Sequence, residues 1–141
     1  MRRDDEGSAT VLTIGLLAVL VAALLTVAAV THLQLERSRL AHAADEVALA
    51  AADAIDMDGY YRTGAVRLSG SELEAAARDQ LAASARRQGL DGAVLVAASS
   101  SDGTTAEVTL AMRAPVLFGA EWLPGRVDLS AYASARAVGE P

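Results

Sequence analysis

The chain of 141 residues contains no cysteine, only two histidines and few aromatic residues. The absence of cysteine excludes disulfides, thiolate metal ligands and a cysteine nucleophile. Both histidines, His32 and His42, precede the small domain expected at residues 59–141, so that domain has no histidine to activate the serines at 99–101. Glycine-rich phosphate-binding signatures are also missing. We therefore expect no catalytic residues, no cofactor and no enzymatic activity.

Metal binding is disfavoured by spacing. The two histidines are ten residues apart, which places them on different turns of a straight helix. The segment Asp56-x-Asp58-Gly59 is similar to part of a calcium loop, but alanines 54 and 65 occupy its first and last ligand positions. The sequence favours an acidic turn over a calcium site, and we expect no metal.

The balance of charge is acidic, with a net charge of -6 and a pI near 4.8. Acidic residues are spread along the chain, and no basic stripe interrupts them. Nucleic-acid binding surfaces are basic, so this pattern argues against a nucleic-acid partner. We expect the charge to keep an exposed domain soluble.

One long hydrophobic run explains the high mean hydropathy of +0.29. Residues Ala9 to Val30 include no charged residue and no proline. At about 1.5 Å per residue, a helix of this length crosses the roughly 30 Å hydrocarbon core of a bilayer. The sequence predicts a leader or flank at 1–7 and a transmembrane helix at 8–32, with the lipid bilayer as a partner.

Two alternatives remain open at this stage. The tripeptide Val27-Ala28-Ala29 satisfies a small-x-small rule, which would release a secreted domain after Ala29. Arginines flank both ends of the run (Arg2 and Arg3 on one side, Arg37 and Arg39 on the other), so charge leaves the orientation undecided.

The helical pattern continues beyond the membrane. Apolar residues recur on one side of residues 33–58, and neither proline nor glycine occurs before Gly59. We expect one helix from about Ser8 to about Asp56, half in lipid and half amphipathic. Its expected inward face comprises Leu33, Leu40, Ala44, Val47, Ala51 and Ile55.

A small α+β domain is expected over residues 59–141. Ser71 and Glu74 fit a capping box, and Gly89 is placed to end the helix that follows. The expected buried stripe of this helix is Leu73, Ala76, Ala77, Leu81 and Ala85. Three antiparallel strands should follow: residues 93–99, an alternating run at 104–113 after the turn at Asp102-Gly103, and another at 126–138.

Two further features concern interfaces. Gly15, Ala18, Ala22 and Thr26 form a stripe of small residues on the membrane helix, which lets helices approach closely in lipid. Most aromatics lie in two places, Tyr60-Tyr61 and a loop with Phe118 and Trp122. We expect Phe118 and Trp122 to fill the core, and the role of the tyrosines stays open.

The N-terminal segment Glu6-Gly7-Ser8-Ala9-Thr10-Val11 before a long hydrophobic helix resembles TadE/TadG-like pilus-assembly proteins, the pseudopilins of tight-adherence (Flp) pili. The alanine-rich stretch RLAHAADEVALAAADA at 39–54 continues the likeness. Near the C-terminus, MRAPVLFG and VDLSAYASARAV resemble the closing strands of that family. The resemblance implies a pilin-like fold and a structural role.

The resemblance also implies partners and a topology. A prepilin peptidase would cut between Gly7 and Ser8 on the cytoplasmic side, and the domain would lie outside the cell membrane. Other pilins or pseudopilins and Tad membrane assembly proteins would be its partners. One position departs from the pattern: many pilins carry Glu at the fifth mature residue, which here is Leu12. Alternatively, Gly7 and Ser8 only begin the helix, with Ser8 as its cap.

The sequence thus indicates a TadE-like minor pilin or pseudopilin of a tight-adherence pilus or related secretion system. The alternative is a single-pass, membrane-anchored envelope scaffold or binding protein unrelated to pili.

Overall fold

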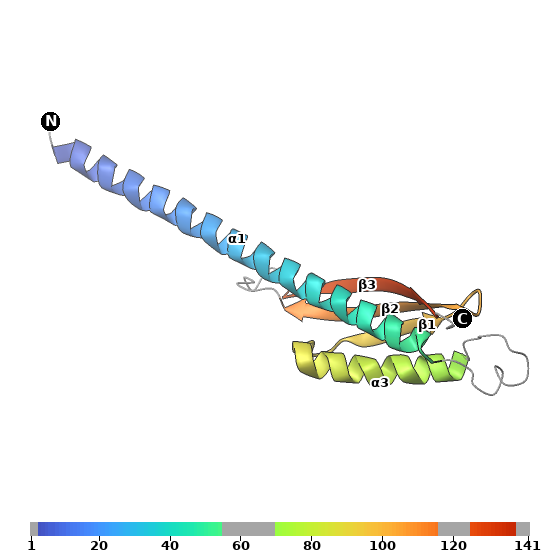
Figure 1. Cartoon of the computed structure of the whole chain (residues 1–141). Coiled ribbons are helices and arrows are strands. Elements are labelled where there is room, and N and C mark those ends of the chain that lie inside the picture. Colours follow the sequence, from blue (N-terminus) through green and yellow to red (C-terminus); the bar gives the residue numbers. More distant parts are fainter. Residues whose placement is uncertain (1–2, 55–69, 116–124, 138–141) are drawn as a thin grey trace, which may run out of the picture.

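The computed structural model describes residues 3–54, 70–115 and 125–137 (Figure 1). Two helices and three strands follow one another along the chain, which confirms the predicted α+β class. Their bounds are α1 (Arg3–Ala52), α3 (Gly70–Gln88), β1 (Val94–Ser99), β2 (Thr105–Pro115) and β3 (Arg126–Arg136). The N-terminal half of α1 projects away from the rest, while its C-terminal half lies beside α3 and the sheet (Figure 1).

Helix α1 differs from the expected helix at both ends. It begins at Arg3, not at Ser8, so Ser8 lies inside the helix and the interpretation of Ser8 as its cap is wrong. The helix ends at Ala52, before the expected Asp56. After this end, the Ala54 N–H donates to the Ala51 carbonyl (3.3 Å), a hydrogen bond with the three-residue spacing of a 3₁₀ turn.

Helix α3 agrees with the expected span to within one residue at its start. It begins at Gly70, just before the predicted cap Ser71, and it stops at Gln88. Gly89 follows with a φ of 66°, the left-handed conformation that terminates many helices and that glycine adopts without strain. The predicted end of the helix at Gly89 is confirmed.

The three strands form an antiparallel sheet in the order β1-β2-β3, with β2 in the centre. The β1–β2 turn contains Gly103 at a φ of 74°, so the predicted turn at Asp102-Gly103 is confirmed. Strand β2 alternates as expected, and its buried side chains are Ala106, Val108, Leu110, Met112 and Ala114. The pairing of β1 with β2 shifts register between Leu95 and Ala97, an irregularity that the sequence did not indicate.

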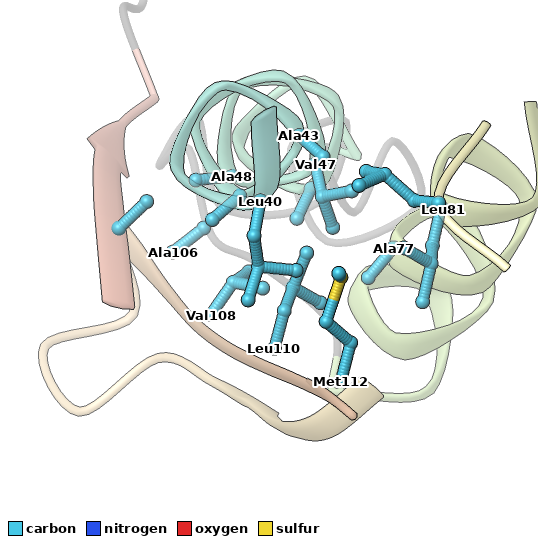
Figure 2. Packing of buried hydrophobic residues seen from close by; sticks show 14 of the residues in the cluster. Leu40, Ala43, Val47, Ala48, Ala77, Leu81, Ala106, Val108, Leu110 and Met112 are labelled. Carbon is cyan, nitrogen blue, oxygen red and sulfur yellow. The ribbon is translucent and has the colours of Figure 1, made fainter. Parts of the chain in front are cut away.

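The core lies between the sheet and the two helices. Figure 2 shows Leu40 and Val47 of α1 pointing toward Val108 and Leu110 of β2, with Leu81 of α3 on the other side of the core. Among the residues that the structure describes, nine of the 17 buried hydrophobic residues are alanine, so the helices pack through thin side chains. Few large side chains therefore fill the described part of the core.

Several expectations concern residues outside the described ranges. These are Ile55 as a core residue, the acidic turn at Asp56, Asp58 and Gly59, the tyrosines Tyr60 and Tyr61, and the aromatic loop with Phe118 and Trp122.

Candidate membrane anchor and assembly surface

The N-terminal half of α1 carries a fully exposed apolar surface. Every residue from Gly7 to Ala28 is exposed, including Leu12 at 73% and Leu24 at 61%. Soluble proteins do not leave so large an apolar surface in water. By length and composition this helix is apolar enough to cross a membrane, and none of its apolar window is buried against the domain. These observations indicate membrane anchoring, as predicted.

Polar groups within this segment are satisfied by the helix itself. The hydroxyl of Thr13 donates to the carbonyl of Ala9 (2.9 Å), and that of Thr26 donates to the carbonyl of Ala22 (2.8 Å). Thr31 repeats the pattern toward Val27 (2.9 Å). Because no water reaches the hydrocarbon core, such internal bonds let threonine remain there without an unsatisfied hydroxyl.

The structure places the residues singled out in the sequence on this exposed segment. Gly15, Ala18, Ala22 and Thr26 are all exposed and recur at steps of three or four residues, which sets them on one side of the helix. Their use as a packing face stays a prediction. Gly7 and Ser8 lie in the second turn of α1, both exposed and helical.

A buried charge marks the point where α1 meets the domain. Only 8% of Glu36 is exposed, and its carboxylate accepts a hydrogen bond from the Arg39 guanidinium at 3.0 Å, one turn along the helix. Leu33, one turn before Glu36, already packs against the core. Burying a carboxylate is costly unless it is paired, so the ion pair with Arg39 offsets the cost of burying Glu36 where α1 begins to pack against the domain. The half-buried His32 lies at the same junction.

A polar cluster joins α1 to α3. The buried hydroxyl of Ser84 donates to the Glu46 carboxylate, which also accepts from the Arg87 guanidinium at 2.9 Å and from the Gln88 side-chain amide at 3.4 Å. The expected buried stripe of α3 contained Ala76 and Ala85, but both are half-buried, and Ser84 is buried instead. The sequence analysis missed Ser84 because it counted only apolar residues as inward-facing. The four-residue step from Gln80 to Ser84 and Gln88 was the available signal.

The β1–β2 turn is held by one carboxylate. Asp102 accepts hydrogen bonds from the N–H groups of Thr104 (2.8 Å) and Thr105 (2.6 Å) and from the Thr105 hydroxyl (2.8 Å). The hydrogen bonds from Thr104 and Thr105 hold the pKa of the Asp102 carboxyl well below its ordinary value. The Asp102 carboxylate therefore stabilises the β1–β2 turn through hydrogen bonds from residues of that same turn.

In the part of the chain that the structure describes, no group of three or more His, Asp and Glu side chains is arranged to hold a metal ion. The depression between the start of β1, the end of β2 and the start of β3 is lined by Val94, Met112, Arg113, Asp128 and Leu129, and its two charged side chains, Arg113 and Asp128, form an ion pair at 3.0 Å.

Comparison with known proteins bears on α1. Residues 7–54 match the family model described as "Putative Flp pilus-assembly TadE/G-like", about one third of the chain. Comparisons with curated proteins and with solved structures found no match. The matched range holds the exposed apolar half of α1 and the half that packs in the domain, so it is this two-part helix that is TadE/G-like, as its sequence motifs indicated.

Proposed function

We propose that this protein is a non-enzymatic minor pilin or pseudopilin, a structural component of a tight-adherence pilus or related secretion system at the cell membrane. The observation that carries this proposal is a single helix, TadE/G-like over residues 7–54, whose first half is exposed and apolar and whose second half is built into a small domain. A helix of this kind fixes a folded domain rigidly above a bilayer.

The proposed topology has the N-terminus in the cytoplasm and the domain outside. The prepilin peptidase that the resemblance implies cuts on the cytoplasmic side, and its proposed cleavage site between Gly7 and Ser8 precedes the apolar run.

The proposed lateral contact uses the stripe of Gly15, Ala18, Ala22 and Thr26. In lipid, helices associate through close packing, for which small residues are suited. The bond from the Thr26 hydroxyl to the Ala22 carbonyl leaves this stripe without an unsatisfied donor, so it offers a smooth surface to another pilin or to a Tad membrane subunit.

Processing after Gly7 would release a chain that begins at Ser8. In the structure this peptide bond lies within the second helical turn, so a peptidase must first unwind the end of α1. Gly7 favours that opening, because glycine weakens a helix by about 1 kcal/mol relative to alanine.

Leu12 distinguishes this chain from pilins with Glu at the fifth mature position. A buried carboxylate in lipid requires a partner, such as the N-terminal amine of a neighbouring pilin. With Leu12 this contact is missing, so we expect weaker incorporation into a filament. This favours a role in the membrane assembly platform over a role within the filament.

Co-purification from host membranes tests the proposal. Membranes are washed with alkali, solubilised, and the full chain is captured through a C-terminal tag. We expect retention in the membrane and recovery of pilins or Tad membrane proteins. The double substitution Gly15→Leu and Ala22→Leu should reduce this recovery, while the control Thr13→Leu, on the opposite side of the helix, should not.

The outcomes separate the alternatives. Retention without any pilus-assembly partner would favour an envelope scaffold unrelated to pili. Loss from the membrane in the alkaline wash would favour a domain released after Ala29.

A further inference from the structure

Charged side chains are sorted along the domain. The C-terminal end of α3, the end of β2 and the start of β3 lie on the side of the projecting half of α1 (Figure 1). We call the arginines at this end, together with those on the adjoining turns of α1, the basic rim. Its members are Arg37, Arg39, Arg86, Arg87, Arg113 and Arg126.

At the opposite end of the domain, exposed acids outnumber the one exposed arginine, Arg136, among the described residues. Asp53 follows the end of α1, Glu72 lies in the first turn of α3, and Asp102 occupies the β1–β2 turn. All three are exposed. The net charge of -6 therefore hides a separation of sign, with positive charge concentrated on the side of the anchor.

Half of the basic rim is not neutralised by the domain. Arg39, Arg87 and Arg113 form ion pairs with Glu36, Glu46 and Asp128, respectively. Among the described residues, Arg37, Arg86 and Arg126 form no ion pair, and all three are exposed.

Besides the three paired acids, Asp91 is a further acid at this end of the domain among the described residues. It lines a shallow depression of about 360 Å³ with Arg113, Pro115 and Arg126, and it forms no ion pair within the described part of the chain. The three unpaired arginines of the rim outnumber it, so positive charge remains in excess there.

The rim begins just beyond the lipid headgroups. Arg37 follows Val30, the last residue of the hydrophobic run 9–30, by seven positions, which is about 10 Å along a helix. The headgroup region on each side of a bilayer is about 5–8 Å thick. Arg126 begins β3 opposite Pro115, at the end of the sheet on the side of the anchor (Figure 1). Extended arginine side chains at this level reach the phosphate layer.

We propose that the basic rim binds the phosphates of anionic lipids in the leaflet from which the domain emerges, and so holds the domain against the membrane. The guanidinium group suits this role because it presents several donors to phosphate oxygens. The inference rests on the proposed function only in requiring α1 to span the membrane. A lipid surface is favoured over an acidic protein because the arginines face the anchor rather than the outer end of the domain.

The test uses the full chain in nanodiscs, and the absence of native cysteine makes single-site labelling clean. A fluorophore is attached at Gly125→Cys, next to Arg126, where an added side chain meets open space. Quenching by headgroup-labelled lipids then reports docking. Nanodiscs of phosphatidylcholine alone are compared with a mixture containing phosphatidylglycerol, and a label at Ser101→Cys in the distal turn serves as the reference.

We expect stronger quenching at residue 125 with phosphatidylglycerol, reversed at high salt, and no change at residue 101. Arg126→Gln should lower the ratio of docked to undocked domain about fivefold, as expected for one arginine near an anionic surface. Arg136→Gln removes the same charge from the other end of β3 and should leave this ratio unchanged.

Equal quenching in both lipid compositions, in a chain that inserts normally, would overturn the lipid proposal alone and would leave the arginines to a protein partner. Equal effects of Arg126→Gln and Arg136→Gln would also overturn it. A chain that fails to enter nanodiscs would refute the anchor, and the rim proposal with it.

Discussion

The thin core makes the stability of the domain depend on a few large side chains, and Leu40 tests this most clearly. It is fully buried where α1 crosses the sheet, and it points toward Val108 and Leu110 (Figure 2). Truncating a buried leucine to alanine costs about 2–5 kcal/mol, because the neighbours close the cavity only partly. Domains of this size have about 5–15 kcal/mol of stability in total, so Leu40→Ala should remove a large share.

Hydrogen exchange of the β2 amides, in the full chain in detergent, measures this loss. A cost of about 3 kcal/mol corresponds to roughly a hundredfold faster exchange through global opening. Leu49→Ala is the matched control, since Leu49 lies on the same helix but is 61% exposed, and its change should stay within about 0.5 kcal/mol. Similar exchange in both variants would refute the reasoning, because it would mean that the domain does not depend on packing against α1.

Three other perturbations test local parts of the structure. Glu46→Ala removes the acceptor of the buried Ser84 hydroxyl and should cost about 1–3 kcal/mol in urea unfolding. Ser84→Ala should cost less, because it removes the donor and leaves no buried hydroxyl without a partner. Gly89→Ala forces a side chain into a positive φ and should lower stability by about 1 kcal/mol in the same assay, whereas Gly70→Ala at the start of α3 should not. Because the pKa of Asp102 is lowered in the fold, its contribution to the free energy of unfolding should be complete above pH 3.8 and should be lost as the pH falls through the lowered value. A carbon NMR titration that gives the Asp102 carboxyl an ordinary pKa would contradict this.

Periodicity predicted most of the fold. In β2, the alternation of Ala106, Val108, Leu110 and Met112 with polar residues identified the buried face correctly. Gly89 and Gly103 marked the end of α3 and the β1–β2 turn, because both positions require a positive φ. Such features depend on neighbours in the chain, so one sequence is enough to find them.

Contacts between distant elements were not predictable in the same way. Ser84 is buried only because Glu46, on another helix, supplies an acceptor. Glu36 is not among the expected inward-facing residues of α1, yet it is buried and paired with Arg39. The sorting of arginines toward one end of the domain likewise becomes visible only once the strands are placed, because the pairing of β2 with β3 brings Arg113 and Arg126 to the same end of the sheet.

The anchor itself was evident from the sequence, while its details were not. The uncharged run to Val30 predicted the exposed apolar half of α1, but Gly7 and Ser8 were equally consistent with a helix start and with a processing site. The structure rules out the Ser8 cap by extending the helix to Arg3. Which faces of the anchor meet lipid and which meet protein is a property of the assembly, and the small-residue stripe remains a hypothesis about it.

The intact mass and N-terminal residue of the protein from host membranes, with the native prepilin peptidase present, test the account most directly. We predict a chain that begins at Ser8 and keeps the whole apolar half of α1. A chain that begins at Met1 or Arg2 would contradict processing as a pseudopilin and make Gly7 an ordinary helix residue, and a chain that begins at Val30 would contradict the membrane anchor.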